Sequence, residues 1–384
     1  MACAGARSKQ KAVSFRRGVA SLSLLGLLCS SCIYMRMFYY NTPSLDAPTY
    51  FESRTVRAST GSTPMKKRAV EAKPPMTDDE RAKYGAFDAL LEKNDTRAFI
   101  AIRDDEIVYE RYFGDVTAKT PLPGFSISKT FAALLVGCAV DDGLVSSLDD
   151  SVVAYIPELS KKTGYDAVTL DEMLRMTSGI DFDEESPSSA KLYYCTDLRQ
   201  RIYQYPVKWT PGQHYLYGSV SIQLLWDVLH RRLGERTVSQ YFEKRVWQPL
   251  GAEHAAAWSL DSEESGVEKL FGGFNATARD HARLGLLYLH GGTLDGHTIV
   301  SQSWIDASLT ADPVAGVVHI TDGDVKRGKY QWFHTLDGRA YFAKGYRGQY
   351  VFVVPDRHMV FVRFGVGYGD VGWPALFLRM ADAG

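Results

Sequence analysis

Strand-like segments near both ends of the chain, with helix-like segments between them, constrain the fold more than any other feature of this sequence. Residues 98–102 and 107–109 are short apolar runs on either side of a turn at Asp104-Asp105, which predicts a β-hairpin. Residues 146–270 are mainly helical in pattern. Four further strands are predicted near the other end of the chain: 330–334, 340–343, 350–354 and 359–364. This order predicts an α+β fold, with an antiparallel sheet built from both ends of the body, flanked by helices, and an inserted, mainly helical subdomain.

The N-terminal 36 residues differ in composition from the rest of the chain. Residues 1–40 hold six basic residues and no acidic one, although the whole chain has 44 basic and 45 acidic residues. Five of the six precede the uncharged run Gly18–Met35, whose 18 residues are close to the minimum that spans a bilayer as a helix. Basic residues before such a run hold that end in the cytoplasm. The sequence therefore predicts an exported, membrane-tethered protein on the periplasmic or extracellular face.

Other interpretations of this head remain open. It resembles a cleaved signal peptide and, less closely, an organelle transit peptide. Cys32 follows two serines like the acceptor cysteine of a bacterial lipoprotein, although Cys29 stands where that pattern has Leu. Residues 37–84 then include a third of the chain's 15 prolines, which predicts a spacer on or away from the surface. One folded domain is expected over residues 85–384, with its helical subdomain at about 146–270.

Composition excludes several classes of protein. At 45% hydrophobic and 23% charged residues, with a formal net charge of −1, the chain has the balance of a globular protein. No cluster of Lys and Arg indicates a nucleic-acid partner. The nine histidines form no H-E-x-x-H motif, and the one C-x-x-C spacing lies inside the apolar run, so neither a metal site nor a cofactor is predicted. Pairing of Cys138 with Cys195 and the oligomeric state stay open.

The first candidate catalytic motif is Ser126-Ile127-Ser128-Lys129, at the start of a predicted apolar helix over 128–140. Ser126 and Lys129, three residues apart on a helix, share one face. A hydroxyl becomes a useful nucleophile when an adjacent base takes its proton. The same spacing occurs at Ser8–Lys11 and Ser188–Lys191, but only Ser126 opens a helix apolar enough to be buried. The alternative interpretation of Ser126 is a helix N-cap.

Two further motifs follow in order, Tyr217-Gly218-Ser219 and Gly345-Tyr346-Arg347-Gly348-Gln349. Together the three resemble the serine β-lactamase and penicillin-recognising superfamily, particularly its class C-like branch of esterases, D-peptidases and 6-aminohexanoate-dimer hydrolases. That superfamily uses an S-x-x-K helix start, a Tyr-x-Asn/Ser loop and a K-T-G-like strand segment. The resemblance covers roughly residues 85–380. It includes four supporting segments: 169–179, 249–251, 272–273 and 278–285.

The resemblance implies acyl transfer through a covalent ester on Ser126, with Lys129 and Tyr217 sharing the proton work. It further implies an oxyanion hole formed by the backbone N–H groups of Ser126 and of Tyr346, which follows Gly345. Ser219 would bind substrate or hold Lys129. The expected substrate is a small ester, amide or peptide. The alternatives are a penicillin-binding-like D-peptidase and a binding module for cell-wall peptide that has lost turnover.

One departure from the family pattern bears on the substrate. Ala343 and Lys344 stand where the K-T-G segment has Lys and Thr, the residues that bind the substrate carboxylate in lactamases. The resemblance therefore implies poor β-lactam hydrolysis and a preference for neutral esters and amides, unless Lys344 or Arg347 replaces the missing cation.

Overall fold

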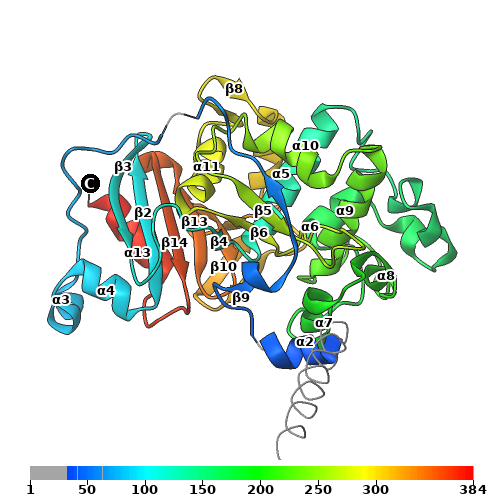
Figure 1. Cartoon of the computed structure of the whole chain (residues 1–384), viewed down its shortest axis with the longest axis horizontal. Helices are drawn as coiled ribbons and strands as arrows, with labels where there is room; N and C mark the ends of the chain where they lie inside the picture. The colour runs from blue at the N-terminus through cyan, green and yellow to red at the C-terminus, as the bar shows by residue number, and fades with distance from the viewer. Residues whose placement is uncertain (1–32, 41, 63, 384) are drawn as a thin grey trace, which may run out of the picture.

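Figure 1 shows the computed structural model, which describes residues 33–40, 42–62 and 64–383. The prediction for Cys32 and most of the run 18–35 lie outside the described residues. Within those residues, no helix has both the length and the apolar character needed to cross a membrane.

An eight-stranded antiparallel sheet forms the centre of the body, in the order β3-β2-β14-β13-β12-β11-β10-β9. The N-terminal hairpin, β2 (Thr96–Arg103) and β3 (Glu106–Tyr112), joins the C-terminal strands because β2 pairs with β14 (Met359–Gly365). The predicted α+β fold, with one sheet built from both ends of the body, is confirmed. The other strands are β9 (Val317–Ile320), β10 (Gly323–Arg327), β11 (Phe333–His334), β12 (Tyr341–Gly345) and β13 (Gln349–Val354).

Helices cover both faces of this sheet (Figure 1). The helices α4 (Phe87–Lys93) and α13 (Trp373–Asp382) pack on one face, where their aromatic side chains meet those of β2, β13 and β14. The helices α5 (Ile127–Asp141) and α11 (Ala278–Leu289) pack on the other face. Because both faces are covered, every residue of β13 and β14 is buried.

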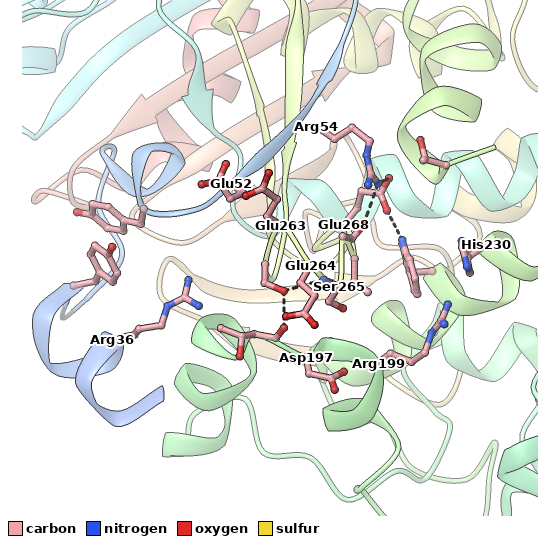
Figure 2. Close-up of a pocket in the computed structure, with 18 residues that line it drawn as sticks. Arg36, Glu52, Arg54, Asp197, Arg199, His230, Glu263, Glu264, Ser265 and Glu268 are labelled. Atoms are coloured by element: carbon pink, nitrogen blue, oxygen red, sulfur yellow. Dashed lines mark hydrogen bonds and ion pairs between the residues drawn. The ribbon is translucent and has the colours of Figure 1, made fainter. Parts of the chain in front are cut away.

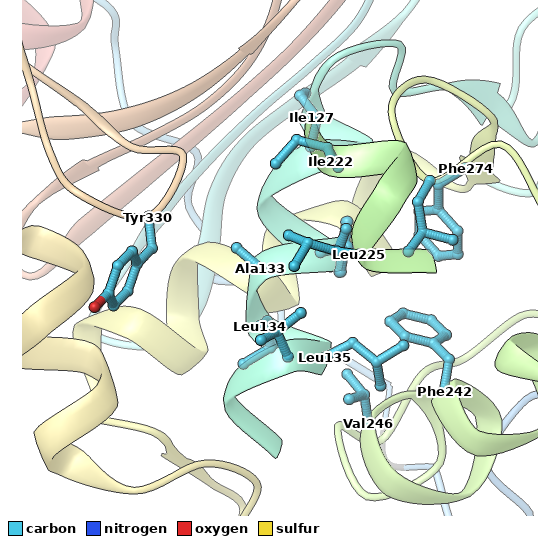
Figure 3. Packing of buried hydrophobic residues seen from close by; sticks show 14 of the residues in the cluster. Ile127, Ala133, Leu134, Leu135, Ile222, Leu225, Phe242, Val246, Phe274 and Tyr330 are labelled. Carbon is cyan, nitrogen blue, oxygen red and sulfur yellow. The ribbon is translucent and has the colours of Figure 1, made fainter. Parts of the chain in front are cut away.

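The helix α5 lies at the centre of the larger hydrophobic core. Every residue from Ile127 to Ala139 is buried, as expected for a helix that is apolar on all sides. Figure 3 shows the side chains that surround it, which come from α9 (Ser219–Arg232), α10 (Val238–Phe242) and β6 (Phe274–Ala276). This burial fixes the position of the N-terminal end of α5, where Ser126 stands.

Residues 146–270 hold most of the other helices, and they also hold one strand. The strand β5 (Ala256–Ser259) belongs to a second sheet in the order β1-β5-β6-β4. The segment is thus mainly helical, but it is tied to the body by this sheet. The elements not yet given are α2 (Ile33–Tyr40), β1 (Ser53–Val56), α3 (Asp78–Tyr84), β4 (Leu122–Pro123), α6 (Leu170–Arg175), α7 (Pro187–Tyr194), α8 (Leu198–Ile202), β7 (Thr293–Leu294), β8 (His297–Thr298) and α12 (Gln302–Leu309).

The Pro-rich segment 37–84 differs from the expected spacer, because much of it packs on the body. The strand β1 pairs with β5, and its Val56 is fully buried. Farther along, Lys67 forms a parallel bridge with Ile107. The backbone groups of β1 are satisfied by a partner some 200 residues away in sequence, which no local pattern reveals. A few apolar side chains such as Ala47 and Phe51 lie buried between the prolines.

Cys138 and Cys195 are both free and buried, so the pairing left open by the sequence does not occur in this structure. Each thiol instead donates to a nearby carbonyl oxygen, Cys138 to Ile299 at 3.3 Å and Cys195 to Leu192 at 3.2 Å.

Candidate active site

Ser126 stands at the N-terminal end of α5, directly after a strained turn. Phe125 adopts a positive φ of 46°, an uncommon conformation for a residue with a side chain and one that often marks functional sites. Ser126 occupies the N-cap position of α5, but its side chain makes no capping bond to the helix. Its Oγ atom lies 2.8 Å from Lys129 Nζ. The two residues that the sequence pairs by spacing are therefore in direct contact.

Lys129 is almost completely buried, with 1% of its surface exposed. Its Nζ atom donates to Ser126 Oγ and, at 2.9 Å, to the backbone oxygen of Phe271. It also lies 5.0 Å from the centre of the Tyr217 ring. Across the part of the chain that the structure describes, no carboxylate forms an ion pair with Lys129. The amine is thus directed at the Ser126 hydroxyl, within the distance that proton transfer requires.

Ser219, expected to contact substrate or Lys129, has a different partner. Its backbone N–H and its hydroxyl both donate to the Glu184 carboxylate, at 2.8 and 2.7 Å. Ser219 is the first residue of α9, where backbone N–H groups have no partner within the helix. The Glu184 carboxylate accepts a hydrogen bond from one of these N–H groups. Tyr217, two residues earlier, remains half-buried at the surface of the cleft. The Tyr217 ring therefore lies beside the Lys129 ammonium group, whereas Ser219 is hydrogen-bonded to Glu184.

Gly345 ends β12 where this strand passes close to the turn before α5. A Cβ atom at position 345 would overlap the backbone oxygen of Gly124, so the approach requires glycine. The next residue, Tyr346, packs its ring edge-to-face on Phe125, with 5.9 Å between ring centres. Among the described residues, the backbone N–H groups of Ser126 and Tyr346 donate to no protein group. These two N–H groups, which the resemblance assigns to an oxyanion hole, therefore have no protein acceptor.

These residues line one cleft with a volume of about 1040 Å³. It contains Ser126, Lys129, Tyr217, Gly345 and Tyr346. The rest of its wall combines aromatic and aliphatic side chains with a short acidic segment and a few other polar residues: Met37, Thr42, Pro43, Phe125, Asp183, Glu184, Glu185, Ser189, Ala190, Tyr193, Tyr194, Tyr215, Leu216, Phe271, Gly272, Val318, His319, Ile320, Thr321, Phe333, Lys344 and Tyr368. Its size and largely apolar wall suit a small organic substrate. In the described ranges, no set of three or more His, Cys, Asp or Glu residues is arranged to hold a metal ion.

The two cations that could replace the K-T-G Lys are engaged elsewhere. Lys344 Nζ forms an ion pair with Asp322 Oδ2 at 2.6 Å. Burial lowers the pKa of Lys344, although the Asp322 carboxylate opposes this shift. Arg347 donates to the backbone oxygens of Pro43 and Val366, at 2.8 and 2.7 Å. Neither cation is therefore available to a substrate carboxylate in this structure.

A second cavity of about 1030 Å³ lies apart from these residues (Figure 2). Its charged side chains bind one another. Arg54 forms an ion pair with Glu268 at 2.5 Å, and Glu268 also accepts a hydrogen bond from the Trp226 indole at 2.7 Å. Arg199, which also lines this cavity, pairs with the buried Asp227 at 3.0 Å. No nucleophile contacts a base there, so the cleft at Ser126 is the candidate active site.

Three groups at the site were not predicted from the sequence: Glu184, Asp322 and the backbone oxygen of Phe271. Each belongs to a loop and meets its partner across a long sequence separation, 142 residues for Phe271 and Lys129. No motif contains them. The nearest signal was the polar, acidic loop 181–185, whose composition gives no specific partner.

Comparison with known proteins agrees with the motifs. The family model described as "Beta-lactamase" matches residues 87–368. A 6-aminohexanoate-dimer hydrolase from Paenarthrobacter ureafaciens is 27% identical over 234 residues, 57% of this chain and 58% of that protein. A lovastatin esterase from Penicillium rubens is 26% identical over 162 residues, 36% of this chain and 40% of that protein. These matches span less than two thirds of either curated relative.

The fold has a counterpart among solved structures. A protein described as a 6-aminohexanoate-dimer hydrolase homologue from Bacillus anthracis superposes with a TM-score of 0.75 at 21% identity, covering 91% of this chain and 93% of that one. At this identity the likeness establishes the fold alone. The family match covers most of the chain and contains the Ser126, Lys129, Tyr217 and Gly345 positions. The predicted resemblance is confirmed, and the chain belongs to the β-lactamase family.

Proposed function

We propose that this protein is a serine hydrolase that cleaves an ester or amide bond through an acyl-enzyme on Ser126. The observation that carries the proposal is the 2.8 Å contact between Ser126 Oγ and the buried Lys129 Nζ. A serine hydroxyl beside a basic amine, in a cleft with free backbone donors, is the arrangement that acyl transfer requires. The names of two relatives, a dimer hydrolase and an esterase, support the same reaction class.

In the first step, Ser126 Oγ attacks the carbonyl carbon while its proton passes to the Lys129–Tyr217 pair. The developing oxyanion accepts hydrogen bonds from the backbone N–H groups of Ser126 and Tyr346. The tetrahedral intermediate then collapses, the bond to the alcohol or amine breaks, and Tyr217 returns a proton to that leaving group. The acyl group is left as an ester on Ser126.

In the second step, water attacks this ester. Tyr217 takes a proton from the water, and the same two backbone groups stabilise the second oxyanion. Collapse of the intermediate breaks the bond to Ser126 Oγ, which regains its proton. The products are a carboxylic acid and free enzyme, so each turnover consumes one water molecule and needs no cofactor.

We expect neutral esters and amides to be better substrates than β-lactams. In lactamases of this superfamily a cation and a hydroxyl bind the substrate carboxylate, but here Ala343 has no polar group and Lys344 is paired with Asp322. The acidic loop residues Asp183, Glu184 and Glu185 in the cleft wall would also repel an anionic substrate. A D-peptidase, whose substrate ends in a carboxylate, has less support for the same reason.

The test of this function is covalent labelling with a fluorophosphonate probe. Wild-type protein should be labelled, and Ser126→Ala should lose all labelling while keeping its fold by circular dichroism. Ser188→Ala is the matched control, because Ser188 begins the same S-x-x-K spacing but lies on the separate helix α7. Undiminished labelling of Ser126→Ala would refute the assignment.

We further propose that the N-terminal segment tethers the enzyme to a membrane on its outer face. The support is the basic, acid-free head followed by the uncharged run Gly18–Met35.

A further inference from the structure

The helix α2, at the end of the uncharged run, exposes an unusual surface. Four of its large apolar side chains face solvent, with exposed fractions of 62% for Tyr34, 42% for Met35, 84% for Phe38 and 81% for Tyr39. At 3.6 residues per turn these four positions fall on one side of the helix. A soluble protein rarely exposes contiguous aromatic side chains without a partner for them.

The opposite side of α2 packs on the body. The Tyr40 ring stacks on Tyr50, with 4.5 Å between ring centres, and on Tyr194 of α7 at 6.0 Å. The guanidinium group of Arg36 lies 5.5 Å from the centre of the Phe51 ring. On the other side, the Lys191 ammonium group lies 5.5 Å from the centre of the Tyr34 ring. The helix therefore has one side fixed to the protein, whereas Phe38 and Tyr39 remain more than 80% exposed.

The fixed side of α2 also forms part of the active-site wall. Met37 lines the cleft that contains Ser126, as do Thr42 and Pro43 just after the helix. Arg347 holds this segment through its bond to the Pro43 oxygen. The mouth of the cleft and the uncovered face thus lie on two sides of one short helix.

Other exposed apolar side chains lie at the same rim. Tyr346 is 46% exposed and lines the cleft, and Val317 is 57% exposed on β9, whose next residue Val318 lines it. Figure 1 shows α2, α7 and β9 on one side of the molecule, and residues from all three line the cleft. Exposed apolar side chains therefore lie both on α2 and on elements that line the cleft.

The partner that fits this surface is a lipid bilayer. Aromatic side chains favour the boundary between headgroups and acyl chains, and short helices with one apolar face lie in that plane. The helix α2 has eight residues, far too few to span a bilayer, yet it continues directly from an uncharged run of near-spanning length. The sequence before α2 and the surface of α2 favour the same partner.

We propose that the exposed face of α2 docks on the membrane surface, so that the active-site cleft opens beside the bilayer and takes a carboxylic ester with an apolar acyl chain from it. The substrate part of this proposal rests on the hydrolase function proposed above. The acyl chain would occupy the aromatic and aliphatic wall of the cleft. Ser126 would attack the ester carbonyl, the bond to the alcohol would break and the alcohol would leave with a proton, and water would then hydrolyse the acyl-enzyme to release a fatty acid. The docking part rests on the surface of α2 alone.

Docking is tested by photolabelling of the full chain in phosphatidylcholine vesicles that contain a lipid with a photoreactive acyl chain. Labelled residues should include Phe38 and Tyr39, which lie beyond the uncharged run Gly18–Met35. Labelling confined to residues 1–35 would overturn the docking, because the tether alone explains it. A change in oligomeric size caused by Phe38→Ser/Tyr39→Ser would also overturn it, because it would assign the face to a second copy of the chain.

The substrate class is tested with two esters, p-nitrophenyl palmitate in the vesicles and p-nitrophenyl acetate in solution. In Phe38→Ser/Tyr39→Ser the ratio of kcat/KM for palmitate to that for acetate should fall about fivefold or more, because the cleft no longer lies at the bilayer. Val70→Ser is the matched control, since Val70 is 82% exposed far from the cleft lining, and its ratio should stay at the wild-type value. An unchanged ratio in the double variant would overturn the inference. If wild-type protein hydrolyses neither ester, the proposed function fails, while the labelling pattern still decides the docking.

Discussion

Lys344 Nζ and Asp322 Oδ2 lie 2.6 Å apart, in an ion pair whose side chains are only 9% and 4% exposed. The Tyr350 hydroxyl donates to the same Asp322 oxygen, and burial raises the pKa of Tyr350 well above its usual value. The carboxylate comes from the turn between β9 and β10, and the cation comes from β12. This ion pair therefore links the turn between β9 and β10 to the strand β12. It also engages the Lys344 ammonium group, which is then not available to the carboxylate of a β-lactam.

Short-chain esters should be hydrolysed far better than cephalosporins. A charge-assisted hydrogen bond contributes about 1.5–3 kcal/mol, so its absence costs a carboxylate-bearing substrate roughly ten- to a hundredfold in kcat/KM. Neutral esters lose nothing. Steady-state kinetics with p-nitrophenyl butyrate and a chromogenic cephalosporin is the measurement, and faster turnover of the cephalosporin would show that a cation serves the carboxylate after all.

Lys344→Met should change stability much more than specificity. It leaves the buried Asp322 without its cation, which should lower the free energy of unfolding by about 3 kcal/mol. The double variant Lys344→Met/Asp322→Asn should recover part of this loss, because the uncompensated charge is gone. Urea unfolding measures both. A selective loss of cephalosporin turnover in Lys344→Met would contradict the structural role given to the pair.

Lys129→Met should lower kcat/KM for esters by about 10³-fold, since the base beside the nucleophile is removed. The fold should persist, because Met fills a similar volume and no buried carboxylate is left unpaired. The control is Lys191→Met, at the lysine of the other S-x-x-K spacing in the body, which should keep wild-type kinetics. Activity within tenfold of wild type in Lys129→Met would remove this residue from the mechanism.

Stability should fall as the pH is lowered from about 6.5 towards 4, partly because of His281. Burial lowers the pKa of His281 to about 4, whereas an unfolded chain has a histidine pKa near 6.5. Between these values the unfolded state binds the extra proton, so the contribution of up to about 3 kcal/mol is complete above pH 6.5 and is lost on acidification. Urea titrations at several pH values measure the free energy of unfolding, and in His281→Leu this free energy should fall less between pH 6.5 and 4 than in the wild type. His297→Gln, at an exposed histidine, should show the same pH dependence as the wild type. The same pH dependence in all three proteins would contradict the prediction.

Cell fractionation should place the full chain with membranes, whereas a chain that begins at Thr42 should be recovered without them, because it lacks both the uncharged run and the exposed face of α2. Acetate hydrolysis should persist in this shorter chain, because Ser126, Lys129 and Tyr217 are unchanged. Full-length protein found free in the cytosol would contradict the tether.

The parts of the fold that sequence predicts are those with a local pattern. Apolar runs and strand alternation located β2, β3 and the strands β11 to β14, but they did not locate β9 and β10. The continuous apolarity of 128–140 located α5 and therefore Ser126 and Lys129. The strand β1 was not predicted, because no local sequence pattern marks it. It is formed by pairing with β5, which lies in a distant part of the chain. The partners of Ser219 and Lys344 were missed for the same reason, since Glu184 and Asp322 lie in loops that only the tertiary fold brings to the cleft.

The pairing of β2 with β14 has a consequence for how this protein is made. Residues 96–103 have no neighbour on one edge until residues 359–365, some 260 positions later, have been synthesised. An unpaired strand edge is a template for aggregation, and contacts this far apart in sequence form slowly. The sheet can therefore close only after β14 has been made, so a premature stop before Met359 leaves β2 with an open edge.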